Sequence, residues 1–316
     1  MGMAERIFLS IVLFTLLASF ESSSFAKPSY AVDLMSILSE VQVEEGGFER
    51  IEDEELAAVE SAFLDLLLSG DLLQERWSQI GMSGEAMLIG GRRCVFLCES
   101  PGDERGRGVF LLFVDALAQG NGGQGMNVFL QAPHSFFDRK TGQIVSLLLE
   151  EGKFMGGAWN SSPRYAVDGD YKGPADTQAH SWNYFTAFAR AFAQARELAF
   201  PRSRIVQIHG FAPSKRSSSK ARRASAIISA GTLEPSRQLL PLGLWMKLKF
   251  PPWVLLFPRE VSELGALQNT TGKALRAFGQ GDAFVHIELS WKLRRSLLKD
   301  RDRRAAFAKS LATFLR

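Results

Sequence analysis

The sequence predicts a three-layer α/β/α protein with a mixed, largely parallel central sheet, preceded by a short helical N-terminal segment. From about residue 85 onward, short apolar runs typical of buried strands alternate with turns and helical segments. A helical pattern over 181–198 lies between two such runs, an order typical of a parallel βαβ unit. With 46% hydrophobic residues, the chain of 316 residues can bury a sizeable core.

The N-terminus has the pattern of a secretory signal peptide. Arg6 precedes the apolar run 7–20, and small residues follow up to Ala26. This predicts a signal peptide over 1–26 and an exported protein, periplasmic or secreted. The alternative is an uncleaved anchor, but the run is shorter than the roughly 20 residues that a spanning helix needs.

The mature chain is expected to carry no stable membrane span. The most apolar later stretch, 239–257, is interrupted by Lys247, Lys249 and a pair of prolines. The net charge of +3 is too small to indicate a nucleic-acid partner. We therefore expect no nucleic-acid partner.

We expect the mature chain to divide into a helical N-terminal extension, 27–80, and an α/β domain, 81–316. Apolar residues recur at helical spacing over 32–41 and 53–69. The expected strands of the domain are 86–89, 94–98, 109–114, 127–132, 204–209, 226–232, 253–257 and 283–287. The expected helices are 144–151, 181–198, with Thr177 or Ser181 as N-cap, and 291–315.

Two features in this domain look functional but have simpler interpretations. Cys94 and Cys98 lie on one expected strand, so their Cα atoms would be about 13 Å apart, beyond the reach of a disulfide. We interpret both as apolar core residues. The glycine-rich run 120–125 lacks the Lys-Ser/Thr ending of a phosphate-binding loop and precedes a strand, so it is expected to be a turn.

Potential metal ligands follow two of the expected strands. His134 and Asp138 come directly after 127–132, and His209 ends the strand 204–209. Residues four apart share a face if the turn is helical, and the carboxyl ends of adjacent parallel strands meet at one edge of a sheet. Two histidines and a carboxylate suit a catalytic Zn²⁺, with one coordination position left for water. Asp138 could instead cap the following helix or pair with a neighbouring cation.

Two other pairs of residues could take part in the chemistry. Glu288 follows the strand 283–287, where apolar surroundings would raise its pKa and suit a general base. His286 could support the ligands through a hydrogen bond, or be a satisfied buried histidine. Asp176 and His180 have the same spacing as His134 and Asp138, so they are rival ligands, or could orient a ligand.

Polar residues in two loops could contact a substrate. Asn160 and Arg164 could hold a substrate carboxylate by charge-assisted hydrogen bonds, although Arg164 could equally be an ordinary surface residue. Asn269 lies in a turn that could touch the substrate.

In the order of these motifs, the region Val128 to Ser290 resembles the zinc carboxypeptidase and N-formylglutamate amidohydrolase superfamily. The resemblance implies a phosphorylase/hydrolase-like fold and one zinc ion. It implies His134, Asp138 and His209 as ligands, Glu288 as the base that activates water, and Asn160 with Arg164 as carboxylate anchors. The first motif departs from the family, since His-x-x-Glu is usual there and this chain has His-x-x-x-Asp.

The sequence therefore predicts an exported zinc-dependent hydrolase that cleaves an amide or peptide bond beside a substrate carboxylate. An N-acyl amino acid or an envelope peptide would be the substrate. The alternative is a non-catalytic cell-envelope binding protein that retains the fold. A metal-free esterase is disfavoured because the chain has no Gly-x-Ser-x-Gly motif.

Overall fold

The structure is a computed structural model, and it describes residues 33–41, 48–100, 102–118, 127–166, 178, 180–234, 236–250 and 253–315. All of them belong to one compact unit, Ala31–Arg316. The predicted signal peptide, the glycine-rich run 120–125 and Asp176 lie outside the described residues.

The described part of the chain contains a sheet of nine strands in the order β1-β2-β3-β5-β4-β6-β9-β7-β8. The strands β1 to β3 form an antiparallel meander that continues antiparallel into β5. Then β5, β4, β6 and β9 are parallel neighbours, β7 is antiparallel to β9, and β8 is parallel to β7. The strands are β1 (Met82–Ile89), β2 (Arg92–Glu99), β3 (Val109–Phe113), β4 (Val128–Ala132), β5 (Gly156–Trp159), β6 (Arg204–Phe211), β7 (Ala226–Ser229), β8 (Val254–Leu256) and β9 (Phe284–Ser290).

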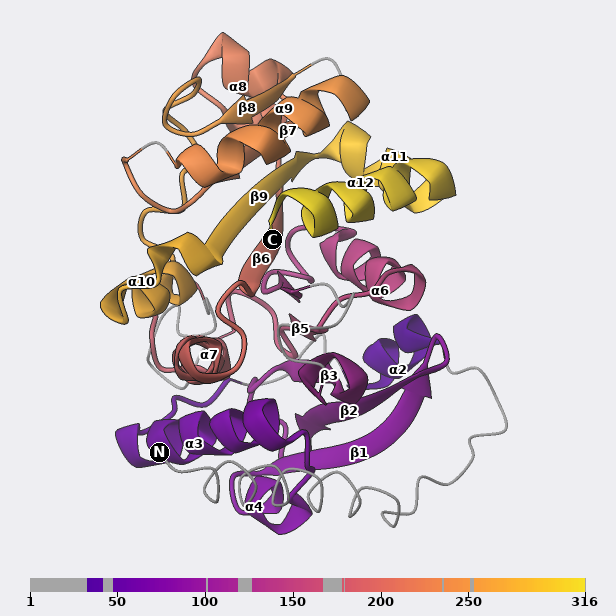
Figure 1. Cartoon of the computed structure of the whole chain (residues 1–316), viewed down its shortest axis with the longest axis vertical. Helices are drawn as coiled ribbons and strands as arrows, with labels where there is room; N and C mark the ends of the chain where they lie inside the picture. The colour runs from indigo at the N-terminus through magenta and orange to yellow at the C-terminus, as the bar shows by residue number, and fades with distance from the viewer. Residues whose placement is uncertain are drawn as a thin grey trace, which may run out of the picture. The chain divides into compact units, whose positions relative to one another are not determined.

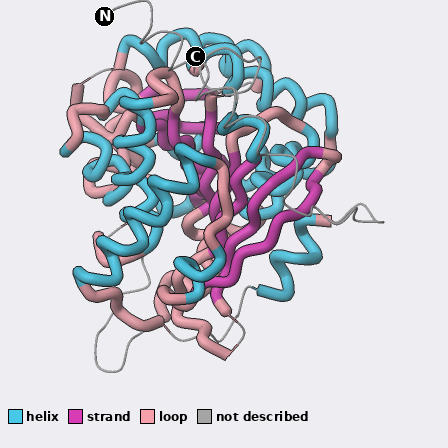
Figure 2. Tube along the Cα trace, turned by 60° about the horizontal axis from the view of Figure 1, so that its bottom comes forward, coloured by secondary structure: helices cyan, strands magenta, loops and turns pink. Residues whose placement is uncertain are grey.

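Helices cover both faces of this sheet, which confirms the predicted α/β class (Figures 1 and 2). On one face lie α3 (Asp53–Ser69), α7 (Tyr184–Leu198) and α10 (Thr270–Ala277). On the other lie α2 (Leu34–Val41), α6 (Thr141–Glu151), α9 (Leu240–Lys249), α11 (Trp291–Lys299) and α12 (Arg301–Phe314). The short elements are α4 (Gln74–Ser78), α5 (Val114–Ala118), α8 (Ser219–Arg223), η3 (Pro213–Lys215), η4 (Arg237–Leu239) and η5 (Gly281–Ala283).

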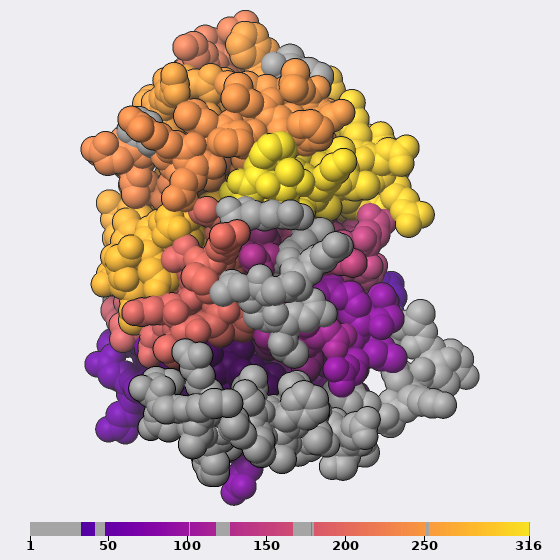
Figure 3. All heavy atoms as spheres, in the orientation of Figure 1, coloured from indigo at the N-terminus to yellow at the C-terminus, as the bar shows by residue number. Residues whose placement is uncertain are grey.

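The two faces of the sheet have different cores because successive side chains of a strand point to opposite sides. On the α3 and α7 face the core is aromatic: the Phe63 and Phe110 rings lie 4.7 Å apart, and those of Phe129 and Phe188 4.3 Å apart. On the opposite face the core is largely aliphatic, and Leu111 and Leu130 pack there with residues of α6 and α12. Figure 3 shows α12 (yellow) against the α9 region (orange) at the surface.

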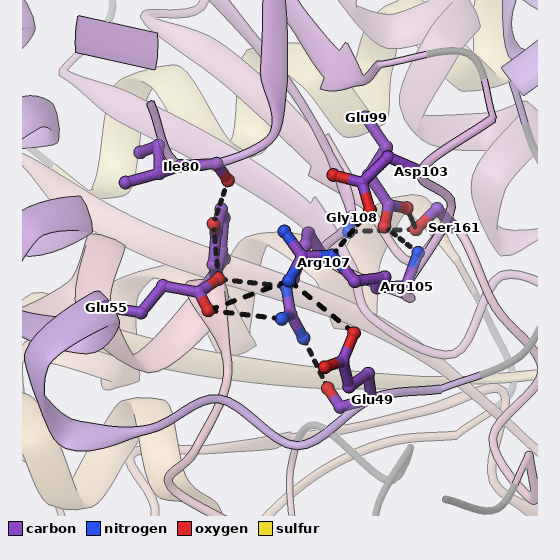
Figure 4. Close-up of polar contacts among 10 residues, drawn as sticks. Glu49, Glu55, Ile80, Glu99, Asp103, Arg105, Arg107, Gly108 and Ser161 are labelled. Atoms are coloured by element: carbon purple, nitrogen blue, oxygen red, sulfur yellow. Dashed lines mark hydrogen bonds and ion pairs between the residues drawn. The ribbon is translucent and has the colours of Figure 1, made fainter. Parts of the chain in front are cut away.

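A partly buried ion pair joins α3 to the segment before β3, and a tyrosine hydroxyl links the pair to α7 (Figure 4). Arg107, 2% exposed, contacts both carboxylate oxygens of Glu55, at 3.0 and 3.2 Å. The Tyr184 hydroxyl lies 2.9 Å from Glu55 Oε1 and from the carbonyl oxygen of Ile80. Burial, with Glu55 beside the hydroxyl, raises the pKa of Tyr184, so the phenol stays neutral. These contacts join the predicted extension to the sheet, and the boundary at residue 80 stays a prediction.

Several local predictions were wrong. The closing helix predicted over 291–315 is two helices, since Asp300 ends α11 and its side chain caps α12 by accepting from the Arg303 amide. The N-cap of α7 is Asn183 rather than Ser181, because the Asn183 side chain accepts from the amide of Thr186. The strand β5 was not predicted.

Both cysteines lie on β2 as free thiols, which agrees with the expectation that they do not bridge. Burial raises the pKa of the Cys94 thiol to about 12. In the described part of the chain, we find no helix with the length and apolar character that crossing a membrane requires.

Replacing Glu55 by Gln should lower the free energy of unfolding by about 2 kcal/mol, because it leaves the Arg107 charge buried beside a neutral amide. Urea denaturation measures the loss. The matched control is Glu60→Gln on the same helix, which removes an ion pair to the half-exposed Arg190 and should cost less than about 1 kcal/mol. Equal losses in both variants would contradict a special role for the partly buried pair.

Candidate metal centre

Three parallel strands bring the predicted site residues to one edge of the sheet. In the order β4-β6-β9, the residue His209 of β6 lies in register with Glu288 of β9. His134 follows β4 by two residues, and the amide of Asp138 donates to the carbonyl oxygen of His134 at 2.7 Å. This is one turn of helical geometry, so the two side chains share a face as the spacing predicted.

The Asp138 carboxylate lies between two histidines. Its Oδ2 atom is 3.1 Å from His209 Nδ1 and 3.6 Å from His134 Nδ1. All three residues are buried. A tetrahedral Zn²⁺ with bonds of 2.0–2.2 Å holds its ligand atoms roughly 3.4 Å apart. The two observed distances are close to this separation, so His134, Asp138 and His209 could hold a metal ion, and their ligand atoms all lie within 4.8 Å of one another.

The charge states in this cluster also suit a metal. Burial disfavours the Asp138 anion, but hydrogen bonds to His134 and His209 outweigh burial and hold the pKa of Asp138 well below its usual value. Burial lowers the pKa of His209 and so favours the neutral imidazole. An ionised carboxylate and a neutral imidazole are the forms that bind a metal.

Glu288 and His286 form a second group with His209 on the same face of the sheet. The ligand atoms of these three residues also lie within 4.8 Å of one another, and His286 Nε2 is 3.8 Å from Glu288 Oε1. Burial, followed by the Asp138 charge, raises the pKa of Glu288 to about 8. Burial likewise lowers the pKa of His286, so this imidazole is neutral. Glu288 Oε2 has no hydrogen-bond partner among the described residues, which leaves it able to accept a proton.

Both groups face one cavity of about 780 Å³. The charged residues in its described wall are Asp138, Arg139, Arg164, Lys215, Arg216, Glu288 and Arg294. Cations therefore outnumber acids in this wall. A cavity with this charge balance attracts an anionic ligand.

The predicted substrate residues lie in different settings. Arg164 lines the cavity, and its guanidinium carbon lies 5.5 Å from the Phe137 ring centre and 5.7 Å from that of Tyr165. Asn160 is buried and is not among the residues that line the cavity. Asn269 lines the cavity, but its Oδ1 accepts from the Gly272 amide and so caps α10.

Of the rival pair Asp176 and His180, only His180 lies among the described residues. His180 stacks on the Trp182 ring at 5.4 Å and belongs to neither metal-binding group that the described residues form. Asp138 does not cap the following helix, because the residue at the N-cap of α6 is Lys140. Its carboxylate contacts the two histidines in place of a neighbouring cation.

Two residues near the site were missed in the sequence. Gln207 lies on β6 with Oε1 3.3 Å from His209 Nε2. Arg294 reaches from α11, and its guanidinium donates to the carbonyl oxygens of Arg139 at 2.6 Å and Phe211 at 3.4 Å. It lies where a side chain on Gly210 would project, so the absence of a Cβ there makes room for this contact. Arg294 thereby ties the turn after β4 to the end of β6.

Known proteins give little guidance. No family model matches the chain, and no curated protein matches it either. Among solved structures, the gene product Atu2144 from Agrobacterium tumefaciens is 15% identical with a TM-score of 0.37, covering 60% of this chain and 89% of its own.

Two structures described as putative metallopeptidases also match. The one from Shewanella denitrificans OS217 is 10% identical with a TM-score of 0.33, covering 86% of this chain and 96% of its own. The one from Shewanella amazonensis SB2B is 10% identical with a TM-score of 0.29, covering 85% and 97%. TM-scores this low carry no argument about the present site.

The raised pKa of Glu288 should make the metal-free protein less stable as the pH rises. The carboxyl keeps its proton up to about pH 8 in the folded state but ionises above its ordinary value of 4.5 in the unfolded chain. The free energy of unfolding should therefore fall by up to about 1.4 kcal/mol per pH unit across this window. Urea denaturation in a chelating buffer measures it. In Glu288→Gln this contribution should disappear. If the free energies of unfolding of the two proteins change with pH in parallel, Glu288 is not the group whose pKa is raised.

Proposed function

We propose that the protein is a zinc-dependent hydrolase that cleaves an amide or peptide bond beside a carboxylate of its substrate. The observation that carries the proposal is the buried Asp138 carboxylate between two histidines, with Glu288 facing the same cavity. In this proposal His134, Asp138 and His209 hold the ion. Export to the periplasm or the outside of the cell belongs to the proposal on the basis of residues 1–26.

The arrangement divides the chemistry among few residues. When bound, zinc supplies a Lewis acid that lowers the pKa of water and polarises a carbonyl group. Glu288 takes the proton from the attacking water and returns it to the leaving amine. A pKa of about 8 suits this role, because a group that titrates near neutrality can first accept and later donate.

The substrate carboxylate would bind to the cationic part of the cavity wall. The sequence predicted Asn160 and Arg164 for this contact, and of the two Arg164 lines the cavity. An arginine offers two parallel donors to a carboxylate. An N-acyl amino acid or a short peptide carries the required group next to an amide bond.

The purified chain should bind one equivalent of zinc, and His209→Ala should lower the zinc affinity at least about 100-fold, because it removes one of three protein ligands. Competition with a chromophoric chelator measures the affinity. His180→Ala is the matched control and should bind zinc as the unmodified protein does. If His180→Ala loses zinc and His209→Ala keeps it, the rival pair is the metal site.

Glu288→Gln should lower kcat by about 10²- to 10⁴-fold on N-acyl amino acids while zinc content stays at one equivalent, because the amide cannot accept the proton. A panel of N-acetyl amino acids and dipeptides, followed by release of the free amine, provides the assay.

The control uses the same substrates after their carboxylate has been converted to an amide. They should react with a raised KM, since they lack the anion that the cavity wall binds. Full activity of Glu288→Gln would remove Glu288 as the base, and equal KM values would remove the carboxylate requirement.

A further inference from the structure

A buried group of amide side chains lies directly behind His209. Gln207, on the same face of β6, is fully buried and is the register partner of Gln131 on β4. Its Nε2 atom lies 2.8 Å from Gln131 Oε1, 2.9 Å from Gln178 Oε1 and 3.0 Å from Thr271 Oγ1. Its Oε1 atom lies 2.7 Å from Asn269 Nδ2 and 3.3 Å from His209 Nε2.

The direction of these hydrogen bonds is set by the backbone at the start of α10. The Gly272 amide can only donate, so the Asn269 atom at 3.1 Å from it is the oxygen Oδ1. The Asn269 NH₂ group therefore faces Gln207 and donates to its Oε1 atom. The same oxygen faces the His209 ring, so His209 Nε2 must carry a hydrogen to bond with it.

The opposite nitrogen of the ring is the one in the metal cluster. A neutral imidazole holds one proton, and with that proton on Nε2 the Nδ1 atom presents a lone pair. His209 Nδ1 lies 3.1 Å from Asp138 Oδ2. In the metal-free protein, a hydrogen on Nδ1 donates to this carboxylate. A hydrogen held on Nε2 by the Gln207 acceptor instead leaves Nδ1 with a lone pair for a cation between the two atoms, so Gln207 favours the tautomer that binds a metal.

We propose that Gln207 and Asn269 are positioning residues that fix the tautomer of His209, so that the N-cap of α10 determines whether Nδ1 can bind the metal. The inference rests on the proposed function, because it takes His209 as a ligand. It gives Asn269 a role that acts through Gln207 in place of direct contact with substrate.

Zinc affinity of the full chain, measured by chelator competition, tests the proposal without any assay of activity. Gln207→Leu should weaken zinc binding about 10- to 100-fold, because it removes the acceptor that holds His209. Gln131→Leu is the matched control: it removes a fully buried glutamine of the same network but leaves the acceptor of His209 in place, so its affinity should change less than about threefold.

Asn269→Asp is the sharper variant. Aspartate can still cap α10, but its second oxygen would face Gln207 Oε1, and the Gln207 amide would have to flip. His209 Nε2 would then meet an NH₂ group, and the proton would move to Nδ1. Zinc should bind about 10-fold more weakly or worse. Charge attraction alone predicts the opposite result, since the substitution adds an anion near a cation site.

The proposal is overturned if either Gln207→Leu or Asn269→Asp binds zinc as tightly as the unmodified protein. A loss in Gln131→Leu equal to that in Gln207→Leu also overturns it, because general loosening of the core would then explain both. If Gln207→Leu does not fold, Asn269→Asp decides, since it keeps the helix cap. Zinc binding that follows the prediction, without hydrolysis of any substrate, would overturn the proposed function alone. An unmodified protein that binds no zinc would overturn both.

Discussion

Parallel pairing of β4, β6 and β9 is the constraint on which the site depends. It places the carboxyl ends of three strands at one edge of the sheet, with His209 beside Glu288 and Gln207 beside His286. Because side chains alternate along β6, Val206 and Ile208 enter the aliphatic core, whereas Gln207 and His209 face the polar network. A register shift of one residue would exchange the two sets, so the packing of the core also holds the site in place.

Burial disfavours the charged form of both carboxylates of the site, but the outcome differs between them. Asp138 is kept ionised by two histidines, whereas burial near the Asp138 charge keeps Glu288 protonated up to about pH 8. One carboxyl group is thereby prepared to bind a cation and the other to exchange a proton. Separation of two pKa values by local environment is a recurrent way to divide roles among chemically similar groups.

The parts of the structure that depend on local patterns could be predicted from the sequence. Continuous apolar runs at 109–114 and 204–209 indicated buried strands, and the four-residue spacing of His134 and Asp138 indicated a shared face. The strand β5 could not be found this way, because Gly156 and Gly157 have low strand propensity. The fold requires glycine at 156, since a Cβ there would collide with the Leu111 carbonyl oxygen of the neighbouring strand. Gln207 escaped notice because its partners come from distant segments.

Gly210 shows how the absence of a side chain can matter as much as its presence. The backbone at this point of β6 leaves a space that the Arg294 guanidinium fills, and Arg294 in turn holds the carbonyl oxygens of Arg139 and Phe211. Even the smallest substitution, to alanine, would compete with the arginine for this space. The substitutions that position 210 tolerates are thus limited by a side chain of α11, a helix that comes much later in the chain. We would expect a tolerated change at either position to require a compensating change at the other.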